Sequence, residues 1–345
     1  MPDNEQLENW LNKRRERRKH LTANELFPKI QAGSREALSA AITLLESNRK
    51  EDAQEAQQLI RQSLPFQNRS WRIGITGVPG VGKSTFIEAF GKEIIQRGLK
   101  LAVLAIDPSS NVTGGSILGD KTRMNWLSTQ ENAFIRPSAA GNSLGGVNRT
   151  TRETIALCEA AGFDVIFIET VGVGQSETLV HSMVDFFLLL MLSGAGDELQ
   201  GIKRGIMEMA DAIVITKADG TNIEKSKLAR AQYANALHLF PPKQSQWIPS
   251  AKICSSIDNT GLGEVWQLIE AFFNHIHSNG WYEENRKKQA INVLHSHLKS
   301  LMLQQFLETD KAKSLIQTKE QAVLKGEISA YQASEDIFKA LFLSV

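Results

Sequence analysis

The stretch Gly77-Val78-Pro79-Gly80-Val81-Gly82-Lys83-Ser84 has the form G-x-x-x-x-G-K-[ST]. The apolar segment at 73–76 before it predicts a short buried strand, and residues 83–96 after it predict a helix. Glycines let the backbone fold tightly and point its N–H groups at phosphate oxygens, and a helix amino terminus favours the same negative charge. This stretch therefore predicts a phosphate-binding loop between a strand and a helix.

The residues of this loop are expected to bind a nucleoside triphosphate in different ways. Lys83 is expected to neutralise the β- and γ-phosphates, and the Ser84 hydroxyl is expected to bind Mg²⁺. The nucleotide is expected to contact the loop and the start of the helix through Gly77, Val78, Pro79, Gly80, Val81, Gly82, Lys83, Ser84 and Thr85.

Short apolar segments alternate with helical segments along the central part of the chain. Strands are predicted at 101–106, 163–168, 184–192, 212–215 and 246–249, and helices at 150–161, 221–239 and 263–277. Such alternation predicts a mainly parallel sheet covered by helices on both faces. Together with the glycine loop, the pattern predicts an α/β fold of the P-loop NTPase class.

Helical patterns flank this central region on both sides. Residues 1–65 predict a helical N-terminal extension, in which Thr22 and Glu25 have the spacing of a capping box. Residues 66–280 are predicted to form the P-loop domain, and residues 281–345 a helical C-terminal arm. The apolar stripe of this arm fits either dimerisation or packing on the sheet, and the sequence does not choose between them.

Composition narrows the class of protein. Hydrophobic residues make up 42% of the chain, charged residues 22%, and the formal net charge is +1, so no global field favours nucleic acid or an anionic membrane. The basic run at 13–20 is typical of a solvated helix face, with a patch for an acidic partner as the alternative. Cys158 and Cys254 are too few and too far apart for a cysteine zinc site or a disulfide framework, so we expect two small buried side chains.

We expect neither a secretion signal nor a membrane-spanning segment in this chain. Its first residues include Asp3, Glu5 and Glu8 with no apolar segment after them, and the longest apolar run, 186–192, is too short to span a bilayer. We therefore expect a cytoplasmic protein that binds neither nucleic acid nor membrane.

Carboxylates follow two of the predicted strands. Asp107 comes directly after the strand at 101–106, and Glu169 after the strand at 163–168. Because ligands of open parallel sheets lie at the carboxyl ends of the strands, both are expected to emerge beside the phosphates. Asp120, in the polar loop that follows Asp107, is a further candidate. These three carboxylates and Ser84 are the predicted ligands of Mg²⁺ or its waters. The three carboxylates and Lys83 form the predicted catalytic set.

Three glycine-bearing loops are predicted to lie near the phosphate site. The segment 169–175 contains Gly172, whose backbone N–H is expected to reach the γ-phosphate and to move when that phosphate leaves. Loops at 111–120 and 193–198 follow other strands. Together they suggest a nucleotide-dependent switch, with plain surface turns as the alternative.

The choice of base depends on Thr216-Lys217-Ala218-Asp219, directly after the predicted strand at 212–215. A carboxylate at Asp219 can accept hydrogen bonds from guanine, and the aliphatic stem of Lys217 can cover the base. The usual GTPase form begins with Asn, and Thr216 is similar to the form in SRP-type GTPases. A second base-contacting loop is expected at Ser250, Ala251 and Lys252, after the predicted strand at 246–249. The presence of both predicted base-contacting segments, in the order found in GTPases, favours guanine over adenine.

The loops also carry a specific resemblance. The runs 104–110, 113–124, 169–177 and 194–203 are similar to the corresponding loops of the MeaB/ArgK family of GTPases, which belongs to the same broad class as the SRP and nickel-metallochaperone GTPases. The similarity extends from about residue 30 to residue 280, and the termini match only in helical character.

This resemblance implies a homodimeric GTPase that chaperones an adenosylcobalamin-dependent acyl-CoA mutase, with methylmalonyl-CoA mutase as the expected partner. GTP hydrolysis would gate cofactor loading and protect the mutase from inactivation. By the same resemblance, Lys83, Ser84, Asp107, Asp120 and Glu169 serve phosphate, Mg²⁺ and hydrolysis. Lys217 and Asp219 serve guanine, and the loop 193–205 responds to the mutase.

Two other functions remain open from the sequence. The ArgK name reflects a kinase-like component of an arginine/ornithine transport system, which would transfer the γ-phosphate to a protein acceptor. A nickel or cobalt metallochaperone is the second alternative. The histidine pairs His275/His277 and His295/His297 are spaced i,i+2, which does not place both on one helix face, and no cysteine motif accompanies them.

Overall fold

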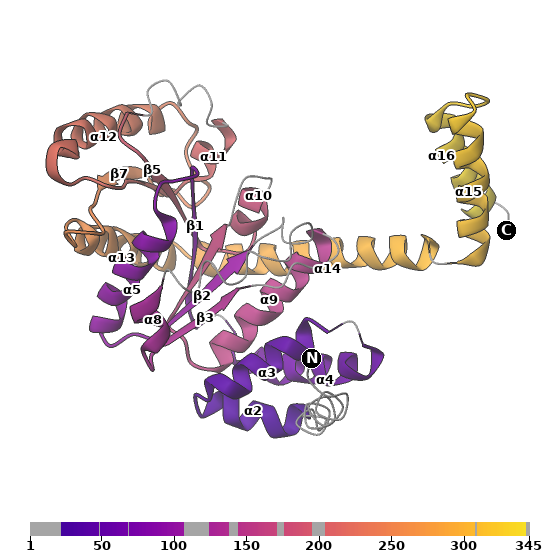
Figure 1. The fold of residues 1–345 in the computed structure, drawn as a ribbon, viewed down its shortest axis with the longest axis horizontal. Coiled ribbons are helices and arrows are strands. Elements are labelled where there is room, and N and C mark those ends of the chain that lie inside the picture. The colour runs from indigo at the N-terminus through magenta and orange to yellow at the C-terminus, as the bar shows by residue number, and fades with distance from the viewer. Residues whose placement is uncertain are drawn as a thin grey trace, which may run out of the picture. The chain divides into compact units, whose positions relative to one another are not determined.

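The structure of the protein is a computed structural model, and it describes residues 22–47, 49–67, 69–106, 124–137, 144–170, 176–194, 204–307 and 309–342. Seven strands in these residues form one sheet in the order β3-β2-β4-β1-β5-β6-β7, and every neighbouring pair is parallel (Figure 1). The predicted parallel α/β sheet of the P-loop class is confirmed. The glycine loop follows the central strand β1, where the order of connections reverses, which is the usual ligand position in such sheets.

The strands are β1 (Trp71–Gly77), β2 (Leu101–Ile106), β3 (Ala133–Pro137), β4 (Val165–Thr170), β5 (Phe186–Met191), β6 (Ala212–Ile215) and β7 (Ser250–Ile253). The helices of the first half are α2 (Ala23–Gln31), α3 (Arg35–Leu45), α4 (Lys50–Ser63), α5 (Lys83–Gln96), α8 (Asn125–Thr129) and α9 (Leu144–Ala160). Those of the second half are α10 (Ser176–His181), α11 (Arg204–Met209), α12 (Ile223–Leu237), α13 (Leu262–Ser278), α14 (Trp281–Leu307), α15 (Asp310–Leu324) and α16 (Ala330–Phe342). Short 3₁₀ turns lie at Leu64–Phe66 and Gly220–Asn222.

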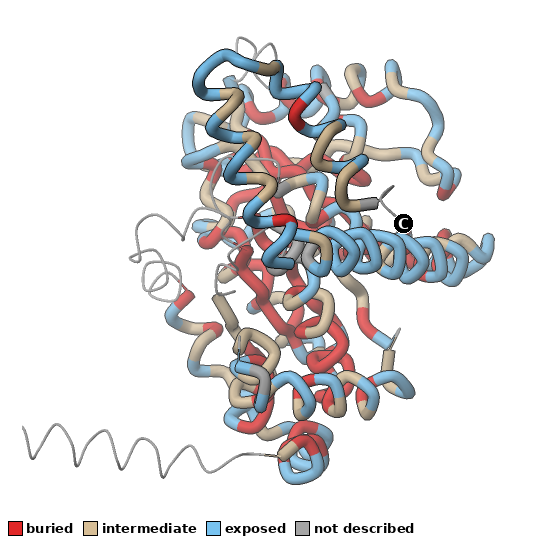
Figure 2. Tube along the Cα trace, turned by 90° about the vertical axis from the view of Figure 1, so that its right-hand side faces the viewer, coloured by how far each residue is buried: buried red, intermediate tan, exposed pale blue. Residues whose placement is uncertain are grey.

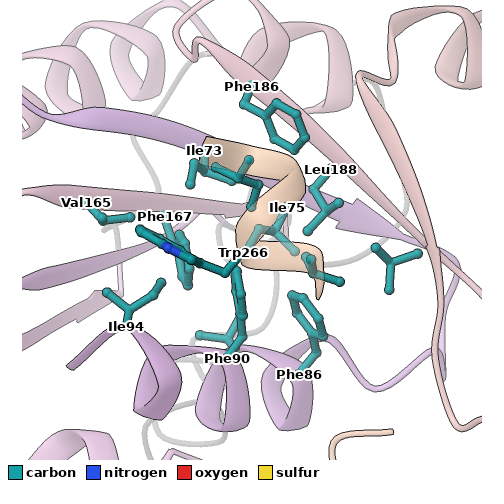
Figure 3. Packing of buried hydrophobic residues seen from close by; sticks show 14 of the residues in the cluster. Ile73, Ile75, Phe86, Phe90, Ile94, Val165, Phe167, Phe186, Leu188 and Trp266 are labelled. Carbon is teal, nitrogen blue, oxygen red and sulfur yellow. The ribbon is translucent and has the colours of Figure 1, made fainter. Parts of the chain in front are cut away.

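One face of the sheet packs against α5 and α13. The side chains of Ile73 and Ile75 on β1 and Phe167 on β4 meet Phe90 of α5 and Trp266 of α13, all fully or almost fully buried (Figure 3). The rings of Phe90 and Phe167 stack with centroids 5.8 Å apart. This aromatic layer fixes α5, and therefore the glycine loop before it, against the central strands.

The other face is covered by α9 to α12 and by the N-terminal helices. Ala102, Leu104 and Ile166 alternate with the residues of the first face and pack against α9 and α2 to α4, while β5 and β6 pack against α12. Figure 2 shows the buried residues, in red, gathered in the interior of the tube. Because both faces are covered, the inner strands β2, β4, β5 and β6 are nearly uniform apolar runs, which is the pattern that made them visible in the sequence.

Several local predictions are confirmed. Thr22 and Glu25 form the capping box of α2, with both reciprocal hydrogen bonds present. The predicted boundaries of α5 match the structure. Cys158 and Cys254 are free and buried, as expected.

Two strand predictions were incomplete or wrong. The edge strand β3 was missed because it is only five residues long and ends in Arg136 and Pro137. The last strand was predicted at 246–249 but lies at Ser250–Ile253. Trp247 gave the earlier segment its apolar character, and its indole Nε1 instead donates to the Asp211 carbonyl at 3.0 Å.

A buried ion-pair cluster lies at the amino-terminal end of β1. It consists of Arg72, Glu159, Asp185 and Arg286, which come from β1, α9, the residue before β5, and the first turns of α14. Arg286 Nη2 lies 2.5 Å from Asp185 Oδ2, and Arg72 Nη2 lies 2.9 Å from Glu159 Oε2. Burial alone would raise the pKa of Glu159, but the charges of Arg72 and Arg286 and the hydrogen bonds from Arg72 and Ser70 outweigh it and lower the pKa.

The chain forms two compact units, residues 1–286 and residues 287–345. The second unit contains most of α14 together with α15 and α16, which pack on each other through the Lys319–Asp336 ion pair at 2.5 Å. Among the helices of the described residues, none is both long enough and apolar enough to cross a bilayer.

Candidate functional site

The glycine loop connects the end of β1 to the start of α5. Gly80 and Gly82 have φ values of 77° and 89°, a left-handed conformation that L side chains rarely adopt. Val81 N donates to Val78 O at 3.2 Å within the turn, and Phe86 N donates to Gly82 O at 2.8 Å as the helix begins. The first backbone N–H groups of α5 therefore have no helical acceptors and face the loop, which suits an anion.

The residues of the loop differ in exposure. Val81 is buried in the core, whereas Pro79, Gly80 and Thr85 are exposed. Lys83 Nζ donates to the Gly77 carbonyl at 3.0 Å, so the ammonium lies back over the loop that precedes it. Ser84 is buried in the first turn of α5. Lys83 and Ser84 therefore both lie in the first turn of α5, directly after the glycine loop.

Glu169 lies in β4, the strand next to β1, with its Cα opposite that of Ile75. It was predicted to emerge just beyond the strand, but β4 continues to Thr170 and the Glu169 side chain is buried. The hydroxyl groups of Thr76 and Thr170 are 2.8 Å apart and join the carboxyl ends of the two strands. Glu169 therefore lies near the carboxyl end of β4, next to the strand that leads into the glycine loop. Asp107, Asp120 and Gly172 lie outside the described residues.

The segment that follows β6 is joined to the glycine loop by two hydrogen bonds. Thr216 Oγ1 donates to the Val81 carbonyl at 2.8 Å, and Lys217 Nζ donates to the Gly80 carbonyl at 2.8 Å. Lys217 itself has a φ of 57°, which is unusual for a residue with a side chain. The hydroxyl of Thr216 thus bonds the glycine loop directly, and the lysine stem extends across the loop towards Gly80.

The carboxylate of Asp219 is oriented by a residue that the sequence analysis missed. Ser255, which is fully buried, donates from Oγ to Asp219 Oδ2 at 2.9 Å, and Ala218 N donates to the Cys254 carbonyl at 3.0 Å. Burial raises the pKa of the Cys254 thiol to about 12, so this cysteine stays protonated and serves as packing. The two loops after β6 and β7 therefore meet at Asp219.

The expected position of the second base-contacting loop was wrong. Ser250, Ala251 and Lys252 form β7 itself, and the loop after that strand begins at Cys254. It ends at Gly261, where an added Cβ would lie 2.3 Å from the Ile253 carbonyl. The error followed from placing the strand four residues too early, and a serine two residues after the true strand was the signal that would have identified Ser255.

The oxygen ligands at this edge of the sheet fit Mg²⁺. A buried hydroxyl at Ser84 and a buried carboxylate at Glu169 are hard donors of the kind that this ion prefers. Ser84 lies on α5, directly after the β1–α5 loop, and Glu169 lies near the carboxyl end of β4, the strand that pairs with β1. Other candidate ligands, Asp107 and Asp120, lie outside the described residues.

The geometry agrees with comparisons with known proteins. The family model described as "Methylmalonyl Co-A mutase-associated GTPase MeaB" matches residues 38–311, which include the glycine loop and both loops that meet at Asp219. The chain belongs to the MeaB family of GTPases. It is therefore a GTP hydrolase that binds guanine nucleotides, as the segment Thr216 to Asp219 after β6 predicted.

Individual relatives cover most of the chain. A probable GTPase of Mycobacterium tuberculosis is 44% identical over 318 residues, covering 92% of this chain and 95% of the relative. The GTPase ArgK of Escherichia coli is 47% identical over 273 residues, with coverages of 79% and 82%. The mitochondrial methylmalonic aciduria type A homolog of Mus musculus is 42% identical over 327 residues, with coverages of 92% and 79%.

A solved structure has the same fold over nearly the whole chain. The crystal structure described as a LAO/AO transport system kinase matches with a TM-score of 0.75 at 35% identity, covering 93% of this chain and 98% of that one. The resemblance to the MeaB/ArgK family that the loops carried in the sequence is thus confirmed.

Proposed function

We propose that this GTPase acts on an adenosylcobalamin-dependent acyl-CoA mutase, with methylmalonyl-CoA mutase as the expected partner, and that GTP hydrolysis gates cofactor loading and protects the mutase. The observation that carries the proposal is the match to a family described by its association with methylmalonyl-CoA mutase, across residues 38–311. A mouse relative named for methylmalonic aciduria supports the same partner. The protein would act in the cytoplasm, where it meets the mutase.

The site residues take the following roles in this proposal. Lys83 neutralises the β- and γ-phosphates once it leaves the Gly77 carbonyl, and the backbone N–H groups of the loop hold the phosphate oxygens. Ser84 and Glu169, with Asp107 and Asp120, hold Mg²⁺ or its waters; the ion supplies positive charge against the phosphates. Gly172 contacts the γ-phosphate.

The guanine base is read by the loops that meet at Asp219. The carboxylate accepts from the base edge, in an orientation set by Ser255, and the stem of Lys217 covers one face of the ring. Thr216 bonds the glycine loop through the Val81 carbonyl, so base and phosphate recognition share one framework.

The test is a reconstitution with a purified methylmalonyl-CoA mutase. The kcat for GTP hydrolysis is measured with and without the mutase, and the rate of mutase inactivation during turnover is measured with and without this protein and GTP. We expect the mutase to accelerate hydrolysis and the protein to slow inactivation only when Lys83 is intact. Unchanged rates in both assays would contradict the proposed partner.

A transport-linked kinase is the second candidate, because the matching crystal structure is described as a LAO/AO transport system kinase. The two functions differ in where the γ-phosphate goes. With γ-labelled GTP, a hydrolase releases label as inorganic phosphate, whereas a kinase leaves it on a protein acceptor. We expect release to phosphate, both alone and with the mutase.

We further propose that the protein is a homodimer joined through α14. Ile291, Leu294, Leu298 and Leu301 are spaced by three, four and three residues and are about half to two-thirds exposed. This is the a/d spacing of a coiled-coil seam, and a second copy of the same face is its natural complement. Light scattering is expected to give a dimer for the wild type and a monomer for Leu298→Glu, while Lys299→Glu on the same helix stays dimeric.

A further inference from the structure

A second group of hydrogen bonds connects the end of β5 to the guanine-reading loop. Ser193 follows β5 by two residues, and its Oγ donates to Asn222 Oδ1 at 2.6 Å. The other end of the same amide, Asn222 Nδ2, donates to the Lys217 carbonyl at 2.6 Å. One side chain therefore joins two loops that are more than twenty residues apart in the sequence.

Lys217 needs such a partner because of its backbone conformation. A lysine at a φ of 57° is less stable than one in the usual regions, so the surrounding contacts must hold it there. Asn222 donates to the Lys217 carbonyl, while Lys217 Nζ donates to the Gly80 carbonyl at 2.8 Å. Ser193, Asn222, Lys217 and Gly80 thus form a continuous chain of contacts from β5 to the glycine loop.

The ordinary structural role of an asparagine at this position does not account for these bonds. Asn222 stands at the N-cap of α12, yet its side chain makes no capping hydrogen bond to that helix. Its Nδ2 lies 3.5 Å from Ser226 Oγ, a long contact compared with the 2.6 Å bond to Lys217. The amide is therefore directed to the loop and to Ser193 more than to its own helix.

We infer that Asn222 is a positioning residue for the nucleotide: it holds Lys217 over the glycine loop and makes guanine-nucleotide affinity depend on the Ser193 end of β5. This inference depends on the proposed roles of Lys217 and Asp219 in binding the base. Asn222 acts through Lys217, so its loss changes binding, while the chemical step at the phosphates is unaffected.

The experiment is a double-mutant cycle on the affinity of fluorescent GDP for the full-length protein. Asn222→Ala is expected to weaken binding about tenfold, equivalent to about 1.4 kcal/mol, and Ser193→Ala about threefold. The double variant is expected to bind no more weakly than Asn222→Ala alone, because both substitutions break one chain of contacts. At saturating GTP, kcat stays within about twofold of the wild type. Asn235→Ala, an exposed asparagine on the same helix, is the matched control and binds normally.

Two outcomes would overturn the inference: Asn222→Ala binding GDP within twofold of the wild type, or a double variant whose loss is the product of the two single losses. If Asn222→Ala does not fold, Ser193→Ala alone tests the inference, because an unchanged GDP affinity in Ser193→Ala contradicts the chain of contacts from Ser193 to Lys217. Asp219→Asn is measured in parallel with GDP and XDP. If Asp219→Asn does not prefer XDP over GDP, the base assignment itself is contradicted. If Asp219→Asn does prefer XDP but Asn222→Ala binds GDP like the wild type, only the role of Asn222 is contradicted.

Discussion

Strand β1 begins beside the buried ion-pair cluster and ends in the glycine loop, and the charged side chains at its two ends have different partners. At the amino end, Arg72 and Arg286 lie against Glu159 and Asp185, so two positive and two negative side chains compensate one another in the interior. At the carboxyl end, Lys83 and Lys217 donate to backbone carbonyls of the loop. A phosphate can compete for a lysine held by a neutral carbonyl, but not for an arginine held by a buried carboxylate.

This difference separates stability from function along a single strand. Breaking a buried pair leaves an uncompensated charge in the interior, so its cost appears in the free energy of unfolding. In the proposed site Lys83 neutralises the phosphates, so the cost of removing it is expected to appear in catalysis. Substitutions at the two ends are therefore expected to affect different measurements.

The largest effect is expected at the amino end. Burial alone would lower the pKa of Arg286, but Asp185 more than compensates and raises it, so the guanidinium stays charged. Arg286→Met leaves Asp185 buried without this partner and is expected to lower the free energy of unfolding by about 3–5 kcal/mol in urea titrations. Lys287→Met, an exposed neighbour, is expected to change it by less than about 0.5 kcal/mol. Equal losses in the two variants would argue against the cluster as a source of stability.

The next effect is expected at the carboxyl end. Lys83→Ala is expected to lower kcat/KM for GTP by about 10²- to 10³-fold, or about 3–4 kcal/mol, because charge on the phosphoryl oxygens loses its neutralising group. The urea midpoint is expected to stay close to that of the wild type. Lys92→Ala, on the exposed side of α5, is the control and keeps normal turnover. A Lys83→Ala protein that hydrolyses GTP normally would show that Lys83 does not act in the hydrolysis.

A smaller effect is expected at Ser255. Ser255→Ala removes the bond that orients Asp219 and is expected to cost about 1 kcal/mol of guanine-nucleotide affinity, roughly fivefold in Kd. Isothermal titration with GDP measures this loss. Ser256→Ala, the next residue along the loop, is the comparison; an equal loss in both variants would indicate a general disturbance of the loop.

The smallest effect is a dependence of stability on acid pH. The pKa of Glu159 lies below its ordinary value of 4.5 in the folded protein, so the folded state holds fewer protons than the unfolded state as the pH falls towards that range. The stability that Glu159 contributes is therefore present above about pH 4.5 and lost below it. Urea titrations from pH 7 to pH 3.5 are expected to decline less steeply for Glu159→Gln than for the wild type. Parallel curves would show that Glu159 does not contribute to the decline.

The site was predictable from sequence to the extent that its chemistry is local. The glycine loop, Lys83 and Ser84 lie in one continuous stretch, and a strand and a helix had to flank it, so the sequence located them within a residue. Thr216 to Asp219 were found for the same reason, because they follow an apolar strand that is buried on both faces.

What the sequence did not reveal depends on contacts between distant segments. The edge strands β3 and β7 are short and only partly buried, so their apolar signal is weak, and Trp247 drew the prediction to the wrong four residues. Ser255 and Asn222 are ordinary polar residues whose importance appears only when the loops after β5, β6 and β7 are brought together. The partners of Arg286 are likewise about a hundred residues away in the chain.

The account depends on one carboxylate reading guanine beside the glycine loop, and nucleotide selectivity measures this most directly. Initial rates of phosphate release from GTP, XTP and ATP are compared for the wild type and Asp219→Asn. An amide in place of the carboxylate exchanges an acceptor for a donor, so the wild type is expected to prefer GTP and the variant XTP, with ATP a poor substrate for both. A variant that retains the wild-type preference for GTP would contradict the account.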